Sequence, residues 1–85
     1  MAYRITYVAS AGKALRMLDR QAARRIFEAI TGLADDPRPP GCITLQRGDG
    51  ELRIRVGDYR VVYDIVDDEL TVLILRIGHR REIYR

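Results

Sequence analysis

The spacing of apolar residues changes once along this chain, and that change limits the possible folds more than any other feature. Between residues 10 and 33 apolar side chains recur every three or four positions, as on one face of a helix, whereas from residue 42 onward they alternate, as in strands. The segment between them, ADDPRPPG, holds three prolines, which remove backbone donors and favour extended conformations. Helices followed by strands predict an α+β fold.

The first half of the chain predicts a short strand and two helices. Residues 3–8 alternate and are rich in β-branched and aromatic types, which indicates an opening strand. A first helix is predicted from Ser10, as its N-cap, to Leu18. A second helix follows Asp19, its predicted N-cap, and carries an apolar stripe that should pack in the core. The stripe consists of Ala23, Ile26, Phe27, Ile30 and Leu33.

The second half predicts a β-meander. Three or four strands separated by short turns account for it, with candidate runs at 42–47, 51–56, 59–66 and 69–77. The last run is apolar on both faces, which is typical of an interior strand in a sheet covered on both sides. We predict one domain over residues 1–85, with two N-terminal helices packed on one face of a small, mainly antiparallel sheet in the order β-α-α-β-β-β.

Size and composition exclude several functions. A chain of 85 residues buries roughly 60% of its unfolded surface, so a cavity for a large cofactor is not expected. One cysteine, Cys42, excludes an internal disulfide, and one histidine, His79, excludes the usual Cys/His zinc site, so neither metal nor cofactor is expected. No uncharged run exceeds eight residues and the start lacks a signal-peptide layout, which predicts a soluble, cytoplasmic protein without a membrane role.

The excess positive charge lies at the end of the chain. Residues 76–85 hold four arginines and one glutamate, a net +3, whereas the first 75 residues hold 11 basic and 11 acidic side chains. A basic segment of this kind attracts phosphate backbones or an acidic partner.

A second basic group is predicted from strand register. If Gly57 and Asp58 form a two-residue hairpin turn, Arg55 lies opposite Arg60, and Arg53 shares their face of the sheet. The opposite face, which should lie on the helices, would carry Leu52, Ile54, Val56, Tyr59, Val61 and Tyr63. Two guanidinium groups directly opposite each other repel by a few tenths of a kcal/mol, roughly, where water screens them, so folding alone does not favour this arrangement.

Two interpretations of this arginine face are open. The arginines extend into solvent or pair with acidic neighbours such as Glu51, Asp64 or Glu69, or they form an anion site in which several forked donors converge on phosphate oxygens. The chain end is expected to add His79, Arg80, Arg81 and Tyr84 to this face. His79 is either solvated or a proton shuttle, because its usual pKa lies near neutrality, and Tyr84 is either an aromatic lid or a stacking platform for a nucleotide base.

The order strand, two helices and meander, together with the segments RVGDYRVVY and GHRREIYR, resembles the RelE/ParE superfamily of toxins from toxin–antitoxin systems. The resemblance covers essentially the whole chain and looks closer to the RelE branch. It implies a metal-independent endoribonuclease that enters the ribosomal A site and cuts messenger RNA, with the 2′-hydroxyl attacking the adjacent phosphate. It also implies a cognate RelB-like antitoxin that neutralises the toxin, with operator DNA bound only through the antitoxin complex.

The resemblance assigns roles residue by residue. Arg55 and Arg60 would stabilise charge on the scissile phosphate, Arg80 would offset charge on the leaving 5′ oxygen, and Tyr84 would orient or stack the nucleotide. The expected catalytic set is Arg53, Arg55, Arg60, His79, Arg80 and Tyr84, and the expected RNA-binding set is Arg47, Arg76, Arg81 and Arg85.

One departure from the family pattern affects the mechanism. Relatives often have lysine on the strand before the hairpin, whereas this chain has Arg53 and Arg55, which stay protonated at any ordinary pH and cannot act as the general base. Either His79 takes that role, or the reaction depends on electrostatics and substrate alignment. The alternative functions are a ParE-like toxin that inhibits DNA gyrase without cutting RNA, and a non-toxic chain retained as a DNA-binding partner.

Overall fold

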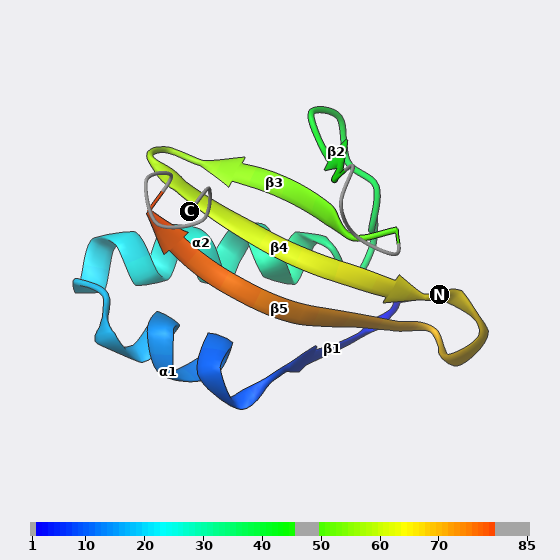
Figure 1. Cartoon of the computed structure of the whole chain (residues 1–85), viewed down its shortest axis with the longest axis horizontal. Helices are drawn as coiled ribbons and strands as arrows, with labels where there is room; N and C mark the ends of the chain where they lie inside the picture. The colour runs from blue at the N-terminus through cyan, green and yellow to red at the C-terminus, as the bar shows by residue number, and fades with distance from the viewer. Residues whose placement is uncertain (1, 46–49, 80–85) are drawn as a thin grey trace.

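Five strands form one sheet with the order β1-β5-β4-β3-β2 in the computed structural model, which describes residues 2–45 and 50–79 (Figure 1). The elements in chain order are β1 (Arg4–Tyr7), α1 (Ala9–Met17), α2 (Arg20–Gly32), β2 (Ile43–Thr44), β3 (Leu52–Val56), β4 (Tyr59–Val66), the 3₁₀ turn η1 (Asp67–Glu69) and β5 (Thr71–His79). β1 pairs with β5 in parallel and the other neighbours are antiparallel. The predicted α+β class and element order are confirmed.

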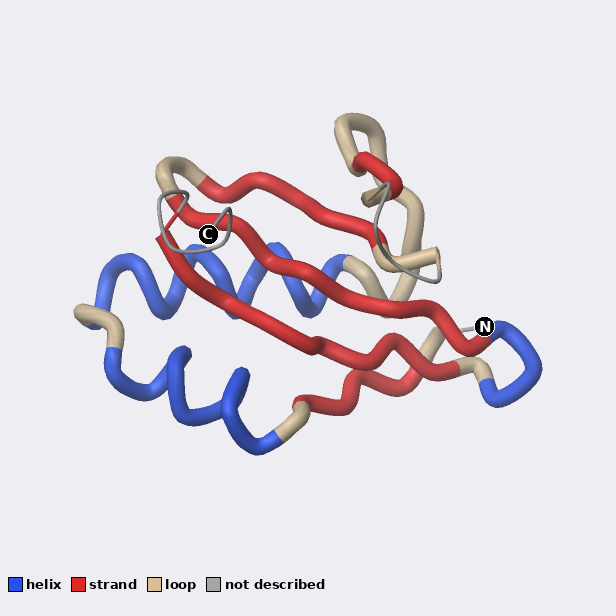
Figure 2. The backbone as a smooth tube through the Cα atoms, viewed as in Figure 1, coloured by secondary structure: helices blue, strands red, loops and turns tan. Residues whose placement is uncertain are grey.

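The two helices cover one face of the sheet and leave the other face open (Figures 1 and 2). Side chains from α2 and the middle strands meet between the layers, where Ile26, Ile30, Val61, Tyr63 and Ile74 are fully buried. Burial of large apolar side chains of this kind is the main favourable term in folding, at about 1.5–3 kcal/mol each. Neither helix in the described part of the chain has the length and apolar content needed to cross a membrane.

The predicted start of α2 is confirmed, and that of α1 is wrong. The Asp19 side chain accepts a hydrogen bond from the Ala22 backbone N–H at 3.2 Å, as an N-cap should. The N-cap is Val8, two residues before the predicted Ser10, so the first helix begins at Ala9 and has no side-chain cap. Because the Val8 carbonyl already accepts the first helical bonds, Ser10 lies inside the first turn.

The predicted stripe of α2 is correct except at one position. Ile26, Ile30 and Leu33 are buried, but the Phe27 side chain is 55% exposed. Phe27 follows Ile26 by one residue and is therefore turned about 100° around the helix, away from the sheet.

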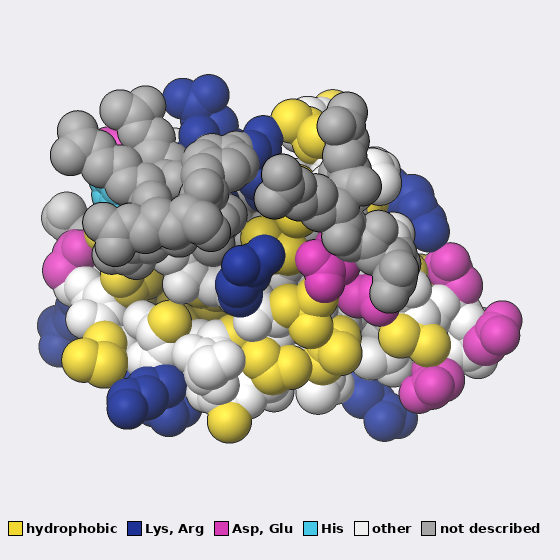
Figure 3. All heavy atoms as spheres, viewed as in Figure 1, with side chains coloured by type: hydrophobic (Ala, Val, Ile, Leu, Met, Phe, Trp, Pro, Cys, Tyr) yellow, Lys and Arg dark blue, Asp and Glu magenta, His cyan; other side chains and the backbone are white. Residues whose placement is uncertain are grey.

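β5 is an interior strand, as predicted, but helices cover only one of its faces, and apolar side chains remain visible on the open face (Figure 3). The strand spans residues 71–79 rather than 69–77. β2 occupies Ile43–Thr44 within the predicted run at 42–47, of which residues 46 and 47 lie outside the described part of the chain. The predicted turn at 47–50 lies, apart from Gly50, outside the described residues.

A register shift in β5 determines which face its last residues occupy. Tyr63 pairs with Ile74 and Val62 with Arg76, so Leu75 is an extra residue, a β-bulge. Ile74 and Ile77 are both buried between the layers, although they are three residues apart. Without the bulge, strict alternation would turn Arg76 toward the helices; with it, Arg76 lies on the open face and is exposed.

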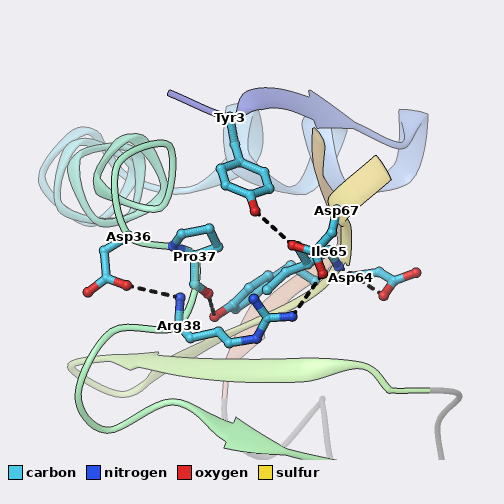
Figure 4. A network of polar contacts seen from close by, with 8 residues as sticks. Tyr3, Asp36, Pro37, Arg38, Asp64, Ile65 and Asp67 are labelled. Atoms are coloured by element: carbon cyan, nitrogen blue, oxygen red, sulfur yellow. Dashed lines mark hydrogen bonds and ion pairs between the residues drawn. The ribbon is translucent and has the colours of Figure 1, made fainter. Parts of the chain in front are cut away.

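Polar contacts join three segments at the η1 end of the sheet (Figure 4). The Tyr3 hydroxyl donates to Asp67 Oδ1 at 2.7 Å, and Arg38 Nη2 donates to Asp67 Oδ2 at 3.2 Å. The hydrogen bond from Tyr3, and then that from Arg38, lowers the pKa of the Asp67 carboxyl, while the bond to Asp67 raises the pKa of the Tyr3 phenol. In addition, the buried Tyr63 donates its hydroxyl to the Pro37 carbonyl at 2.7 Å.

Candidate functional site

The β3–β4 hairpin carries the candidate site, and its predicted register is confirmed in all five pairs. Val56 pairs with Tyr59 and Arg55 with Arg60, so Gly57 and Asp58 form the whole turn. Gly57 has a φ of +61°, which glycine adopts without strain and which the first central position of a type II′ turn requires. The two-residue turn therefore holds two arginines directly opposite each other.

Both arginines reach the same backbone oxygen. Arg55 Nε donates to the Gly57 carbonyl at 3.4 Å, and Arg60 Nη1 donates to that carbonyl at 3.5 Å and to the Tyr59 carbonyl at 3.2 Å. The partner of Arg60 on the next strand is Gly78, so no side chain stands beside it in β5. Two guanidinium groups thus converge at the turn.

The two arginines differ in exposure. Arg60 is 7% exposed, whereas Arg55 is exposed and has no carboxylate within 4 Å among the residues that the structure describes. Burying a charged group costs free energy unless hydrogen bonds or opposite charges offset that cost. A buried arginine thus lies directly opposite an exposed arginine in the hairpin.

Arg53 and Arg76 lie on the same open face, one row farther from the turn. Val62 of β4 pairs with Arg53 of β3 on one side and with Arg76 of β5 on the other. Because neighbouring strands are about 4.8 Å apart, the Cα atoms of the two arginines are about 10 Å apart. The structure thus brings Arg53, Arg55, Arg60 and Arg76 onto one face of the sheet, in two adjacent rows.

His79 lies on the other face. It pairs with Tyr59, and the two rings meet edge to face with their centroids 5.8 Å apart. Both residues line a hollow together with Ala14, Met17 and Leu18, beside α1. The prediction that His79 joins the arginine face is therefore wrong. The β-bulge is the reason, because it shifts Ile77, and His79 two residues later, to the helix side.

The sequence did not single out Arg25 of α2, which also lies at the turn. A Cβ atom at Gly57 would come within 3.6 Å of Arg25 Nη2 and 3.8 Å of Arg25 Nη1. The sequence placed Arg25 outside the apolar stripe of α2, which is correct, but no pattern along the chain indicates that the helix brings it to Gly57.

Five predicted site residues, Arg47, Arg80, Arg81, Tyr84 and Arg85, lie outside the described residues. Within the described ranges, no group of three His, Cys, Asp or Glu side chains could hold a metal ion.

Comparison with known proteins gives the family. The family model for the ParE toxin of type II toxin–antitoxin systems matches residues 4–84. The chain belongs to the RelE/ParE superfamily of toxins. It is thus a toxin of a type II toxin–antitoxin system.

Relatives of this RelE/ParE toxin match along 94–100% of its length. Toxin RelG of Mycobacterium tuberculosis is 33% identical over 86 residues, covering 100% of this chain and 99% of RelG. The archaeal RelE–RelB complex from Pyrococcus horikoshii OT3 contains a chain that is 30% identical, with a TM-score of 0.82 over 94% of this toxin and 97% of that chain. The RelBE2 toxin–antitoxin complex from M. tuberculosis gives the same identity and TM-score over 94% of this toxin and 100% of that chain.

Proposed function

We propose that this toxin is a ribosome-dependent endoribonuclease that cuts messenger RNA in the ribosomal A site without a metal ion. The observation that carries the proposal is the pairing of Arg55 with Arg60, whose guanidinium groups converge on the Gly57 carbonyl. Like charges held face to face oppose folding, but they suit a phosphate group, whose oxygens accept hydrogen bonds from several guanidinium donors at once.

In the proposed reaction the 2′-oxygen attacks the adjacent phosphorus, the bond to the 5′ oxygen breaks, and a 2′,3′-cyclic phosphate and a 5′-hydroxyl end are formed. Negative charge develops on the phosphate oxygens. Arg55 and Arg60 stabilise that charge, and Arg53 and Arg76 bind neighbouring phosphates. Preorganised donors of this kind contribute about 10²–10³ in rate each. Arg80 would offset charge on the leaving oxygen and Tyr84 would orient or stack the nucleotide; Arg47, Arg81 and Arg85 complete the proposed RNA contacts.

The proton on the attacking 2′-hydroxyl needs an acceptor other than arginine. Because His79 faces α1 and Tyr59, on the side of the sheet opposite Arg55, we do not assign it this role. We propose that the 2′-hydroxyl gives its proton to a water molecule while the ribosome aligns the 2′-oxygen with the phosphorus, and that the leaving 5′ oxygen takes a proton from water to become a hydroxyl. The arginines lower the barrier by electrostatics. Alignment alone can contribute about 7–11 kcal/mol.

A RelB-like antitoxin is the proposed partner, since the related toxins from P. horikoshii and M. tuberculosis were solved in complexes with antitoxins. An acidic segment lying across the arginine face would block RNA binding by charge complementarity. Operator DNA would be bound through that complex. The proposed substrate places the toxin in the cytoplasm.

A second candidate function is inhibition of DNA gyrase, because the matching family model is that of ParE toxins. In this case the same scaffold binds its target and leaves RNA intact.

Cleavage of translated messages distinguishes the two functions. We would induce wild type and Arg60→Ala in cells and map the 5′ ends of translated messages by primer extension, with gyrase–DNA breaks assayed in parallel. We expect new 5′ ends at codon positions with wild type and about 10²–10³-fold slower cutting in Arg60→Ala. Intact messages with trapped gyrase–DNA breaks would contradict the nuclease and support the second candidate.

Two further variants control for folding. Arg60 is buried, so Arg60→Ala is checked for its thermal unfolding midpoint, and the exposed Arg55→Ala serves as a second loss-of-activity variant. Arg24→Ala is the matched control, because Arg24 is an exposed arginine of α2 that pairs with Glu28 at 3.3 Å. Equal cleavage by Arg55→Ala and Arg24→Ala would remove the hairpin arginines from the mechanism.

A further inference from the structure

We propose that Arg25 of α2 extends the phosphate-binding surface around the β3–β4 turn onto the helix side of the sheet, so that an RNA strand crosses the turn and places an additional phosphate there. The identification of the ligand as RNA rests on the proposed function.

The position of Gly57 carries this inference. On one side, its carbonyl accepts hydrogen bonds from Arg55 Nε and Arg60 Nη1. On the other, the space that a side chain would fill is bordered by Arg25, with Nη2 at 3.6 Å, Nη1 at 3.8 Å and Cζ at 3.9 Å from an ideal Cβ. Three guanidinium groups from three elements therefore surround one residue of the turn.

Arg25 is not used to stabilise α2. It is exposed, lies outside the buried stripe, and has no carboxylate within 4 Å among the described residues. Arg24, the preceding residue, shows the usual arrangement for a surface arginine on a helix, because its Nε pairs with Glu28 Oε1 one turn later. The two neighbours thus differ in surroundings while sharing a helix, a charge and an exposed position.

A hollow beside the turn matches a phosphate in size. It measures about 210 Å³ and is lined by Arg25, Gly57, Asp58 and Tyr59, together with apolar side chains of α2 and β3. Pockets that enclose drug-sized ligands measure roughly 300–1,000 Å³, so this hollow suits a phosphate with its water molecules better than a whole nucleoside. Asp58, which lines the hollow, opposes an anion there, so Asp58→Asn should strengthen binding.

The test measures binding to an RNA that cannot be cut. We would follow the fluorescence anisotropy of a single-stranded 2′-O-methyl oligoribonucleotide, in which the attacking hydroxyl is blocked, over a series of salt concentrations. Loss of one phosphate contact makes the negative slope of log K against log salt shallower by about 0.7. This amounts to about fivefold weaker binding at 0.1 M salt. We expect this change in Arg25→Gln, no change in Arg24→Gln, and tighter binding in Asp58→Asn.

Three outcomes would overturn the inference. These are an unchanged slope in Arg25→Gln, an equal loss in Arg24→Gln, and no binding of the oligonucleotide by wild type at low salt.

Ribosome-dependent cleavage supplies the second readout, in which Arg25→Gln should need more toxin for half-maximal cutting at an unchanged maximal rate. If wild type binds RNA through Arg25 but does not cut messages, the nuclease proposal fails alone; if wild type cuts and Arg25→Gln behaves as wild type, the inference fails alone.

Discussion

The two ends of the sheet use charged side chains in opposite ways. At the η1 end, Arg38 and Tyr3 both bond to the Asp67 carboxylate, so a positive group and a phenol meet a negative one. At the hairpin end, Arg55 and Arg60 lie opposite each other on neighbouring strands, and both donate to the Gly57 carbonyl. Figure 3 shows acidic side chains grouped toward the η1 end of the open face.

This difference separates contacts that serve the fold from contacts that oppose it. The η1 network links the residue before β1, the loop after α2, strand β4 and the turn before β5. Each contact pairs a donor with a carboxylate or carbonyl acceptor, and none brings like charges together. The hairpin needs no charged contact to form, because its register follows from a two-residue turn and an apolar inner face. The charges of Arg55 and Arg60 are therefore not required for the hairpin to form, and substitutions at the two ends should separate stability from activity.

The largest expected effect on stability is at the η1 end. Tyr63→Phe removes the 2.7 Å hydrogen bond to the Pro37 carbonyl from a fully buried side chain and should lower the free energy of unfolding by about 1–2 kcal/mol. Urea unfolding measures this value, and Tyr3→Phe, which loses an exposed hydrogen bond, is the matched control with a smaller expected loss. Cleavage by Tyr63→Phe should stay within twofold of wild type. A large loss of cleavage in a folded Tyr63→Phe would break the separation between the ends.

The next effect depends on pH. Because the pKa of Asp67 is lowered in the folded protein, its contribution to stability is complete above the unfolded pKa of about 3.9 and is lost as the pH falls through the folded value. Wild type should therefore lose stability more steeply than Asp67→Asn below about pH 4, as measured by urea unfolding between pH 2 and pH 6. Parallel curves for the two proteins would show that the Asp67 contacts do not survive in solution.

Local sequence signals sufficed for the parts of the fold in which nearby residues decide the outcome. The hairpin register followed from Gly57 and Asp58 because a two-residue turn leaves one pairing that keeps the apolar side chains inside. Asp19 was identified as an N-cap because its side chain bonds to a backbone group three residues away. The arginine pair of the candidate site depends only on these local rules.

The remaining site features depend on how distant elements pack. The extra residue Leu75 in β5 leaves no mark in an apolar run, yet it decides that Arg76 joins the open face and that His79 does not. The approach of Arg25 to Gly57 depends on where α2 lies on the sheet. Periodicity identifies the buried side of a helix but not the strand residue that it meets.

The smallest expected effect distinguishes the two ends most clearly. Removing an arginine should raise the free energy of unfolding at the hairpin end and lower it at the η1 end. Replacing Arg55 by glutamine removes the repulsion across the hairpin and should raise the free energy of unfolding by roughly a few tenths of a kcal/mol, while cleavage falls. Salt screens exposed charges. Added salt should therefore weaken the repulsion in the hairpin and stabilise wild type relative to Arg55→Gln. At the η1 end, salt should weaken the attraction between Arg38 and Asp67, so the stability difference between wild type and Arg38→Gln should shrink. Urea unfolding at 0.05 and 0.5 M NaCl measures both differences. Lower stability of Arg55→Gln at both salt concentrations would mean that the bond from Arg55 to the Gly57 carbonyl outweighs the repulsion, and the hairpin arginines would then belong with the contacts that hold the fold.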